Sequence, residues 1–166
     1  MQRRQNNRSR NVRKRSGVAA VECAVVLPVM LVLVLGLIEI GTALRASTIM
    51  QSAIREAGRL ASMDWRYVVE NGQTPNEKVE QDIRNFVTAS GLPGDDLIVS
   101  IEFAEGENEG NPFDIQDTDN ELELMLIEVE LPYSSISLFP TNYLGGQNVR
   151  AGMVSRAGIA GGNLTN

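Results

Sequence analysis

The chain has 166 residues, enough for one domain and an appendage, and its hydrophobic content of 43% is ordinary for a folded protein. One cysteine and no histidine exclude an internal disulfide and remove the commonest general base and metal ligand. The formal net charge of −6 combines two opposite parts: seven of the 15 Lys and Arg residues lie in the first fifteen positions, which leaves 8 basic against 21 acidic groups in the remainder. That remainder carries a net charge of −13, which disfavours a nucleic-acid binder.

The segment from Val18 to Leu44 contains no Lys or Arg, and residues 24–38 carry no charged or strongly polar side chain. As a helix with a rise of about 1.5 Å per residue, it would reach roughly 40 Å, enough to cross a hydrocarbon core of about 30 Å. The sequence therefore predicts a transmembrane helix at residues 18–44. Because the basic run directly precedes it, we expect a cytoplasmic amino end and an acidic domain outside.

Two other uses of an apolar amino-terminal segment fit less well. A cleaved secretory signal needs a small-x-small site after its apolar core, and residues 36–38 and 41–43 could supply one. Apolar and helix-forming residues continue through both without a break, however. A lipoprotein anchor at Cys23 is disfavoured because the apolar core follows this cysteine instead of preceding it.

The junction of the basic and apolar runs, RSGVAAVECAVVLPVML at residues 15–31, resembles the amino-terminal signature of the TadE-like pseudopilins of tight-adherence pilus systems. In that family a basic leader ends in glycine, cleavage follows the glycine, and a glutamate lies five residues into the mature chain, before an aromatic residue. The resemblance implies that a prepilin peptidase removes residues 1–17, cutting between Gly17 and Val18. It also makes Glu22 the fifth-position glutamate, while Cys23 departs from the pattern.

Further parts of the chain strengthen this resemblance, which covers residues 15 to about 62. Leu27-Pro28 lies inside the apolar run, GLIEIG at residues 36–41 lies at its end, and SAIREAGRLA at residues 52–61 is similar to the next helical stretch of the family. Pro28 removes one backbone hydrogen bond, so we expect a local helix kink there. Glu39, near the outer boundary, is interpreted as an interfacial residue.

Glu22 needs its own explanation, because a carboxylate inside an apolar span costs about 2.5–3.5 kcal/mol on insertion scales. Cleavage after Gly17 would expose an α-amino group on Val18, just over one helical turn from Glu22. Consistent with the resemblance, our hypothesis is that Glu22 of one subunit neutralises the Val18 ammonium of a neighbour and so selects a register. The alternative is a carboxylate that reaches the cytoplasmic interface on its own.

Beyond the span, apolar or small residues recur at steps of three and four, which predicts an amphipathic stem helix at residues 45–68, ending near Tyr67. The recurring residues are Ile40, Leu44, Ser47, Met50, Ile54, Ala57 and Ala61. The small residues Ala53, Ala57, Gly58 and Ala61 allow close approach of another helix or a sheet. Thr74-Pro75-Asn76-Glu77 is typical of a capped helix start, and Gly91 with Pro93 of a helix stop, so a second helix is expected at 75–90. Alternation with a period of two predicts strands at residues 97–103, 123–131 and 148–157.

These elements predict an α+β fold. A long amino-terminal transmembrane helix continues into the stem, which packs on a small antiparallel sheet of about three strands with one extra helix. Residues 69–166 would form the extracytoplasmic domain. The loop at residues 105–121 is acidic, and we interpret it as solvated; its Asp117, Asp119 and Glu121 lack the glycine and distal glutamate of a calcium loop, so no metal site is expected. Ser134, Ser135 and Ser137 are interpreted as turn residues, since no histidine accompanies them.

Together these features predict a minor pilin or pseudopilin in the cytoplasmic (inner) membrane, involved in assembly of a tight-adherence type pilus. The expected partners are a prepilin peptidase, other pilin or pseudopilin subunits, inner-membrane pilus assembly proteins and the lipid bilayer. We expect no catalytic residue, no cofactor and no enzymatic activity. The alternative is a permanently anchored single-span protein whose outer domain binds a ligand or partner. The mature amino terminus distinguishes the two.

Overall fold

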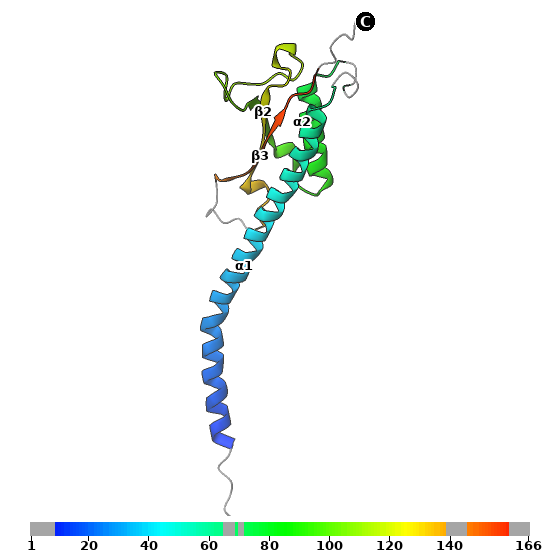
Figure 1. Cartoon of the computed structure of the whole chain (residues 1–166). Coiled ribbons are helices and arrows are strands. Elements are labelled where there is room, and N and C mark those ends of the chain that lie inside the picture. The colour runs from blue at the N-terminus through cyan, green and yellow to red at the C-terminus, as the bar shows by residue number, and fades with distance from the viewer. Residues whose placement is uncertain (1–8, 65–68, 70–71, 139–145, 160–166) are drawn as a thin grey trace, which may run out of the picture. The chain divides into compact units, whose positions relative to one another are not determined.

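The computed structural model describes residues 9–64, 69, 72–138 and 146–159, with side chains from Gly17 onward. The chain divides into two compact units, Met1–Ile40 and Gly41–Asn166, and each is described by itself. The helices and strands, in chain order, are α1 Ser9–Ala61, α2 Pro75–Ala89, β1 Ile98–Phe103, β2 Leu124–Pro132 and β3 Asn148–Arg156 (Figure 1). Short 3-10 turns lie at η2 Gly94–Asp96, η3 Thr118–Asn120 and η4 Tyr133–Ser135. The predicted α+β class is confirmed.

The three strands form one antiparallel sheet in the order β1-β2-β3. Each strand begins and ends within one residue of its predicted position. Alternate residues of the central strand are completely buried, whereas the residues between them are half-buried. One face of the sheet therefore carries the core, as the period of two predicts. The buried set on β2 is Met125, Ile127, Val129 and Leu131.

Both helices pack on this one face, because their apolar stripes belong to the same core cluster as β2. The stripe of α1 lies at steps of one, three and four residues, which places it on one side of the helix. It consists of Ala46, Met50, Ala53, Ile54, Ala57 and Ala61. Ile40 and Leu44, which the sequence pattern placed in the stripe, are 58% and 63% exposed. α1 also ends at Ala61, before the expected Tyr67; residues 65–68 lie outside the described residues.

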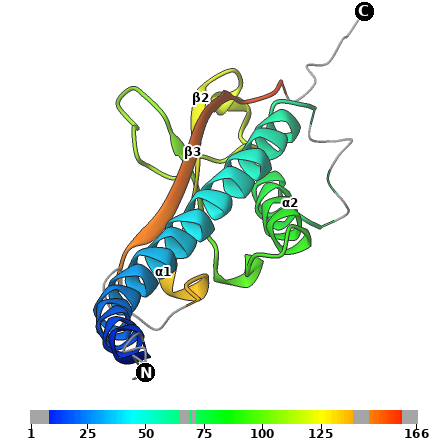
Figure 2. The same ribbon diagram turned by 90° about the horizontal axis from the view of Figure 1, so that it is seen from below.

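α1 approaches the sheet closely at Gly58. A Cβ atom on this residue would lie 2.1 Å from Cε of Met153 on β3. The Ser62 hydroxyl, one turn further, donates to the Arg156 carbonyl at 2.8 Å and lies 3.0 Å from the Ser155 hydroxyl. β3 therefore runs beside α1, in the same direction, as Figure 2 shows. The close approach expected of the small residues is confirmed here.

α2 begins as its sequence predicts. The Thr74 hydroxyl accepts a hydrogen bond from the Glu77 backbone N–H, and the Glu77 carboxylate accepts one from the Thr74 backbone N–H. This capping box satisfies two donors at the helix start. Val79, Ile83 and Val87 then enter the core, and the helix ends before Gly91, whose φ is +83°.

The acidic side chains of the long loop between β1 and β2 are exposed from Glu105 to Asp119, as predicted, but two apolar residues of the loop are buried, which the prediction for residues 105–121 did not include. Phe113 and Ile115 are 2% and 5% exposed, and the ring centroids of Phe113 and Phe103 lie 4.7 Å apart. The Phe113 N–H donates to the Ile101 carbonyl at 2.9 Å, and Phe103 exchanges two bonds with residues 110 and 111. Residues 110–113 thus cover the outer edge of β1 at Ile101 and Phe103.

Asn76 holds this loop to the start of α2. Its side-chain amide donates to the Phe113 carbonyl at 2.7 Å and accepts from the Ile115 N–H at 3.0 Å. One side-chain amide therefore satisfies both the carbonyl of Phe113 and the N–H of Ile115, as the backbone of a paired strand would. In the same loop, the Asp114 and Asp117 carboxylates accept local N–H groups from Gln116 and Asp119.

We predict that Asn76→Ala lowers the free energy of unfolding by about 1–3 kcal/mol, since it leaves the two half-buried backbone groups unsatisfied. Thermal unfolding of the full chain in detergent, followed by circular dichroism, measures the change. Asn85→Ala is the matched control, because Asn85 is exposed on the same helix and gains helix propensity as alanine. Equal stability of the two variants would contradict the role assigned to Asn76.

Candidate functional site

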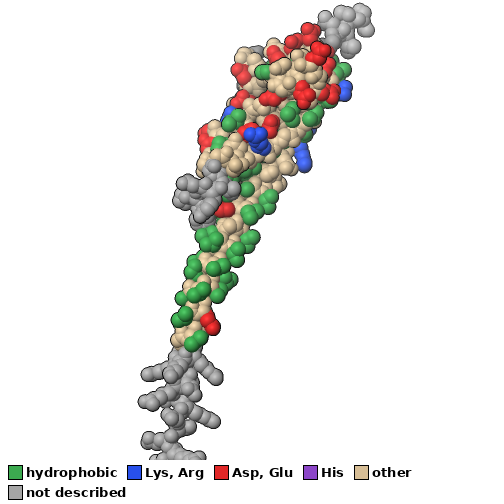
Figure 3. Space-filling model, turned by 90° about the vertical axis from the view of Figure 1, so that its left-hand side faces the viewer, with side chains coloured by type: hydrophobic (Ala, Val, Ile, Leu, Met, Phe, Trp, Pro, Cys, Tyr) green, Lys and Arg blue, Asp and Glu red, His purple; other side chains and the backbone are tan. Residues whose placement is uncertain are grey.

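The amino-terminal unit presents apolar side chains in every direction. All residues from Gly17 to Ile38 are exposed, including Val32 at 70% and Leu37 at 69%. Figure 3 shows hydrophobic side chains along this part of α1 and acidic side chains gathered on the α+β domain. Apolar surface of this extent is unfavourable in water and suits a hydrocarbon environment. Among the described residues, α1 is the one helix long and apolar enough to cross a membrane.

The predicted processing residues lie together at the start of this unit. Val18 and Glu22 are four residues apart on one helix, so they share a face. A Cβ atom at Gly17 would meet no atom within 4 Å. Gly17 and Val18 lie within the continuous helix α1, which begins at Ser9.

Glu22 and Cys23 line a shallow hollow with three apolar neighbours, Val26, Leu27 and Met30. Val26 and Met30 follow Glu22 at steps of four, so these three side chains lie on one side of the helix, with the carboxylate nearest the amino end. Sequence reasoning weighed Glu22 by itself and missed these neighbours, although the steps of four were visible in the sequence. Cys23 is a free, exposed thiol. Helix α1 continues through Pro28, and the expected kink stays a prediction.

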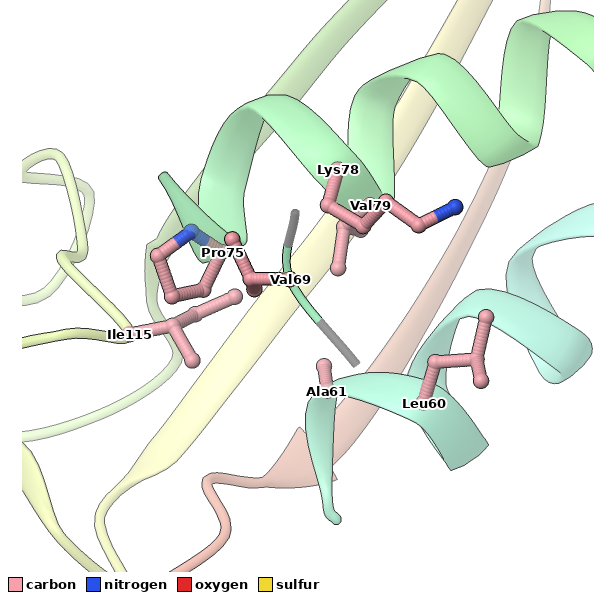
Figure 4. A pocket seen from close by; sticks show the side chains of 7 residues that line it. All are labelled: Leu60, Ala61, Val69, Pro75, Lys78, Val79 and Ile115. Carbon is pink, nitrogen blue, oxygen red and sulfur yellow. The ribbon is translucent and has the colours of Figure 1, made fainter. Parts of the chain in front are cut away.

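The described surface of the second unit has a small recess and a wider hollow, and neither has the features of a ligand site. A small recess forms where the end of α1 meets the start of α2, lined by the side chains in Figure 4: Leu60, Ala61, Val69, Pro75, Lys78, Val79 and Ile115. It holds about 10 Å³, far below the roughly 300 Å³ of a ligand pocket. The Lys78 ammonium is paired with Asp82 at 2.6 Å. This recess is therefore a packing junction.

A wider hollow of about 450 Å³ is open to solvent beside the end of β3, between Ser62, Leu122, Arg156 and Ile159. Its Ser62 hydroxyl is already bonded to the Gly58 and Arg156 carbonyls. Leu122 is 49% exposed with a φ of +65°, a region that is strained for leucine. Among the residues that the structure describes, no polar or charged side chain is buried, and no group of three acidic or cysteine side chains lies where it could hold a metal ion.

An ion pair on the exposed side of α1 shifts the pKa values of its two members, Glu56 and Arg59. The Arg59 guanidinium donates to the Glu56 carboxylate. This hydrogen bond, helped by the opposite charge, lowers the pKa of Glu56 and raises the pKa of Arg59. Both side chains are at least half exposed, so solvent screens the pair and it contributes little to stability.

Comparison with known proteins identifies the segment that carries the candidate site. Residues 17–59 match the TadE-like protein family. The chain therefore carries a TadE-like segment, and the resemblance seen in the sequence is confirmed over these residues. No curated protein and no solved structure matches the chain. The TadE-like segment and its exposed apolar helix together indicate a single-pass membrane protein related to Tad pili.

We predict that Cys23, the one cysteine of the chain, is shielded from a water-soluble maleimide in membranes that are open on both sides. Lipid covers the exposed face of α1 there, and detergent with denaturant should restore labelling. Arg55→Cys in a Cys23→Ala background is the control, because Arg55 is exposed on α1 in the second unit and should label in both conditions. Rapid labelling of Cys23 in intact bilayers would show that this part of α1 is not in the membrane.

Proposed function

We propose that the chain is a minor pilin or pseudopilin that acts in assembly of a tight-adherence type pilus and has no enzymatic activity. The observation that carries the proposal is the TadE-like match, which begins at Gly17 and leaves the basic residues before it outside the match. An exposed apolar helix follows at once, as a subunit drawn from a membrane into a filament requires. The absence of histidine from the sequence accords with a role in assembly instead of acid–base catalysis.

The proposed order of events begins in the cytoplasmic membrane, with residues 1–17 inside and the acidic domain outside. A prepilin peptidase cuts after Gly17, and Val18 becomes a cationic amino terminus. Glu22, on the same helix face as Val18, then pairs with the Val18 ammonium of an adjacent subunit. In a low-dielectric environment each charge is costly alone, so the pair favours one register between neighbouring helices. The other partners are pilin subunits and inner-membrane assembly proteins.

We predict that Gly17→Arg blocks maturation. A side chain at the scissile bond misplaces it in the peptidase, and a misplacement of about 1 Å can cost about a hundredfold in rate. Intact-mass measurement of the protein from its native membrane should show the full-length precursor in the variant and a chain beginning at Val18 in the parent.

The control is Gly36→Ala, since a Cβ atom at Gly36 also meets nothing within 4 Å and that position lies far from the cut. A parent protein that retains its first seventeen residues would remove the pilin proposal and leave a permanently anchored ectodomain. A Gly17→Arg protein that matures normally would show that this glycine is not read by the peptidase.

We predict that Glu22→Gln is processed normally but assembles poorly. The substitution keeps the shape and removes the charge, so the Val18 ammonium of the neighbour is left unpaired, at a cost of about 3–5 kcal/mol in a buried pair. The measurement is the amount of mature chain that co-purifies with other pilus components, relative to the amount in the membrane. Glu39→Gln, on the same apolar helix, is the matched control. Normal co-purification of the Glu22→Gln chain would exclude the pairing.

A further inference from the structure

The first residues of the second unit lie close to the bilayer because the chain enters this unit at Gly41. As a helix, residues 18–38 rise by roughly 31 Å, which fills a hydrocarbon core of about 30 Å. α1 continues without a break to Ala61, so Arg45 lies within about 11 Å of the end of that segment. This limit depends on chain length alone and holds for any angle between the two units. Leu44 is 63% exposed, and Arg45 beside it is exposed as well.

Two other elements of the second unit reach the same level of α1. The Arg45 guanidinium donates to the Ser90 carbonyl at 3.2 Å, so the end of α2 lies beside Arg45. On the sheet, Met153 lies against Gly58, and Asn148 precedes Met153 by about 17 Å of strand. That length equals about eleven residues of helix. Because β3 and α1 run in the same direction, the start of β3 lies level with about residue 47 of α1.

The turn η4 brings a second exposed leucine to this end of the unit. The Tyr133 N–H donates to the Gln147 carbonyl, so η4 follows the β2–β3 ladder at the level where β3 starts. Figure 1 shows η4 (orange) beside α1 at this end of the domain. Ile136 is buried in the core, whereas Leu138 is 63% exposed. We call Leu44, Arg45 and Leu138 the juxtamembrane surface.

The acidic loop lies at the opposite end of the unit. The Ala157 N–H donates to the Glu123 carbonyl, and the Gly158 N–H donates to the Ala61 carbonyl. The end of the loop is therefore level with the last turn of α1, far from η4 (Figure 1). Along α1, Arg45 and Ala61 are roughly 24 Å apart, about three Debye lengths at physiological salt. The negative charge of the loop is thus screened from the juxtamembrane surface.

We propose that the juxtamembrane surface binds the phospholipid layer that faces the domain, with Arg45 bound to a lipid phosphate and Leu44 and Leu138 against the acyl-chain boundary. A guanidinium can donate two parallel hydrogen bonds to a phosphate. Among the described residues, Ser90 is the partner of Arg45 and takes one of its N–H groups, so the others remain for a lipid. Long basic side chains near the end of a span reach the interface in this way.

Lipid is the occupant because the juxtamembrane surface continues the exposed apolar part of α1 without a gap. Ile40 is 58% exposed and Leu44 63%, although both continue the helical period of the buried stripe. A lipid boundary accounts for apolar residues that the sheet does not cover. The inference rests on the membrane segment and does not depend on the pilus proposal.

The experiment uses the full chain in vesicles of phosphatidylcholine and phosphatidylglycerol, diluted so that no second copy can cover the surface. A nitrobenzoxadiazole fluorophore is attached to Leu138→Cys in a Cys23→Ala background, and quenching by lipids with a nitroxide on the headgroup is measured. Leu122→Cys is the matched control, since Leu122 is 49% exposed and lies beside Arg156 at the opposite end of the unit. We expect the nitroxide to remove most of the emission at Leu138 and none at Leu122.

A variant of Arg45 tests the phosphate contact. Arg45→Gln removes the charge and should lower the quenching at Leu138 severalfold, because a charge-assisted hydrogen bond to phosphate is lost. Arg45→Lys keeps the charge and should retain the quenching, and Arg55→Gln, at an exposed arginine further along α1, should not change it.

Three results would overturn the proposal. One is an unquenched Leu138 probe, and a blue-shifted emission from it would show that protein covers the surface instead of lipid. The second is equal quenching at Leu138 and Leu122, and the third is an equal effect of Arg45→Gln and Arg55→Gln. The comparison of Leu138 with Leu122 needs no change at Arg45, so it decides the matter even if the Arg45→Gln chain does not fold.

Discussion

The contact between α1 and the sheet is the interaction on which the second unit depends. Ala53 and Ala57 of α1 are almost fully buried, and at Gly58 even a methyl group would collide with Met153 of β3. Small residues on the helix let larger ones on the central strand fill the space between the two elements. A three-stranded sheet is marginally stable without something packed on its apolar face. Because α1 supplies that packing, the sheet cannot be separated from the helix that also contains the membrane segment.

Helix α1 therefore has two parts with different patterns of apolar residues. Up to Ile38 its side chains are apolar and exposed on all sides, which suits a span that contacts lipid or other helices. From Ala46 the apolar residues are restricted to one side, and the other side carries residues such as Arg55 and Glu56. The change from an all-round to a one-sided pattern marks where the surroundings of the helix change. Glu22 is the exception within the first pattern, which is why it needs a partner.

Much of this fold follows from local chemistry that a sequence displays. The capping box of Thr74 and Glu77 formed as predicted, since both of its bonds join residues three apart. The strands were predictable because alternation with a period of two survives in β2 without interruption. The candidate site residues Gly17, Val18, Glu22 and Cys23 came from a short motif that lies in one helix.

Features that depend on distant residues were not predictable in this way. The burial of Phe113 and Ile115 relies on Asn76, nearly forty positions earlier, and the acidic residues around them indicated only solvent. The close fit of Gly94 is another case, since a Cβ atom there would lie 2.5 Å from the Arg84 carbonyl. The sequence pattern also placed Ile40 and Leu44 on the buried side of α1, but both side chains are exposed. The helical period of apolar residues continues there, although the buried residues of α1 begin only at Ala46.

The covering of β1 also determines where the charge of the domain lies. Anchoring Phe113 in the core and residues 110–113 on the strand edge leaves residues 105–109 exposed at the tip of the loop. The whole loop from Glu105 to Glu121 contains seven acidic residues and no basic one. Like charges repel across contacts that exclude water, so two copies of the domain would not associate through this loop.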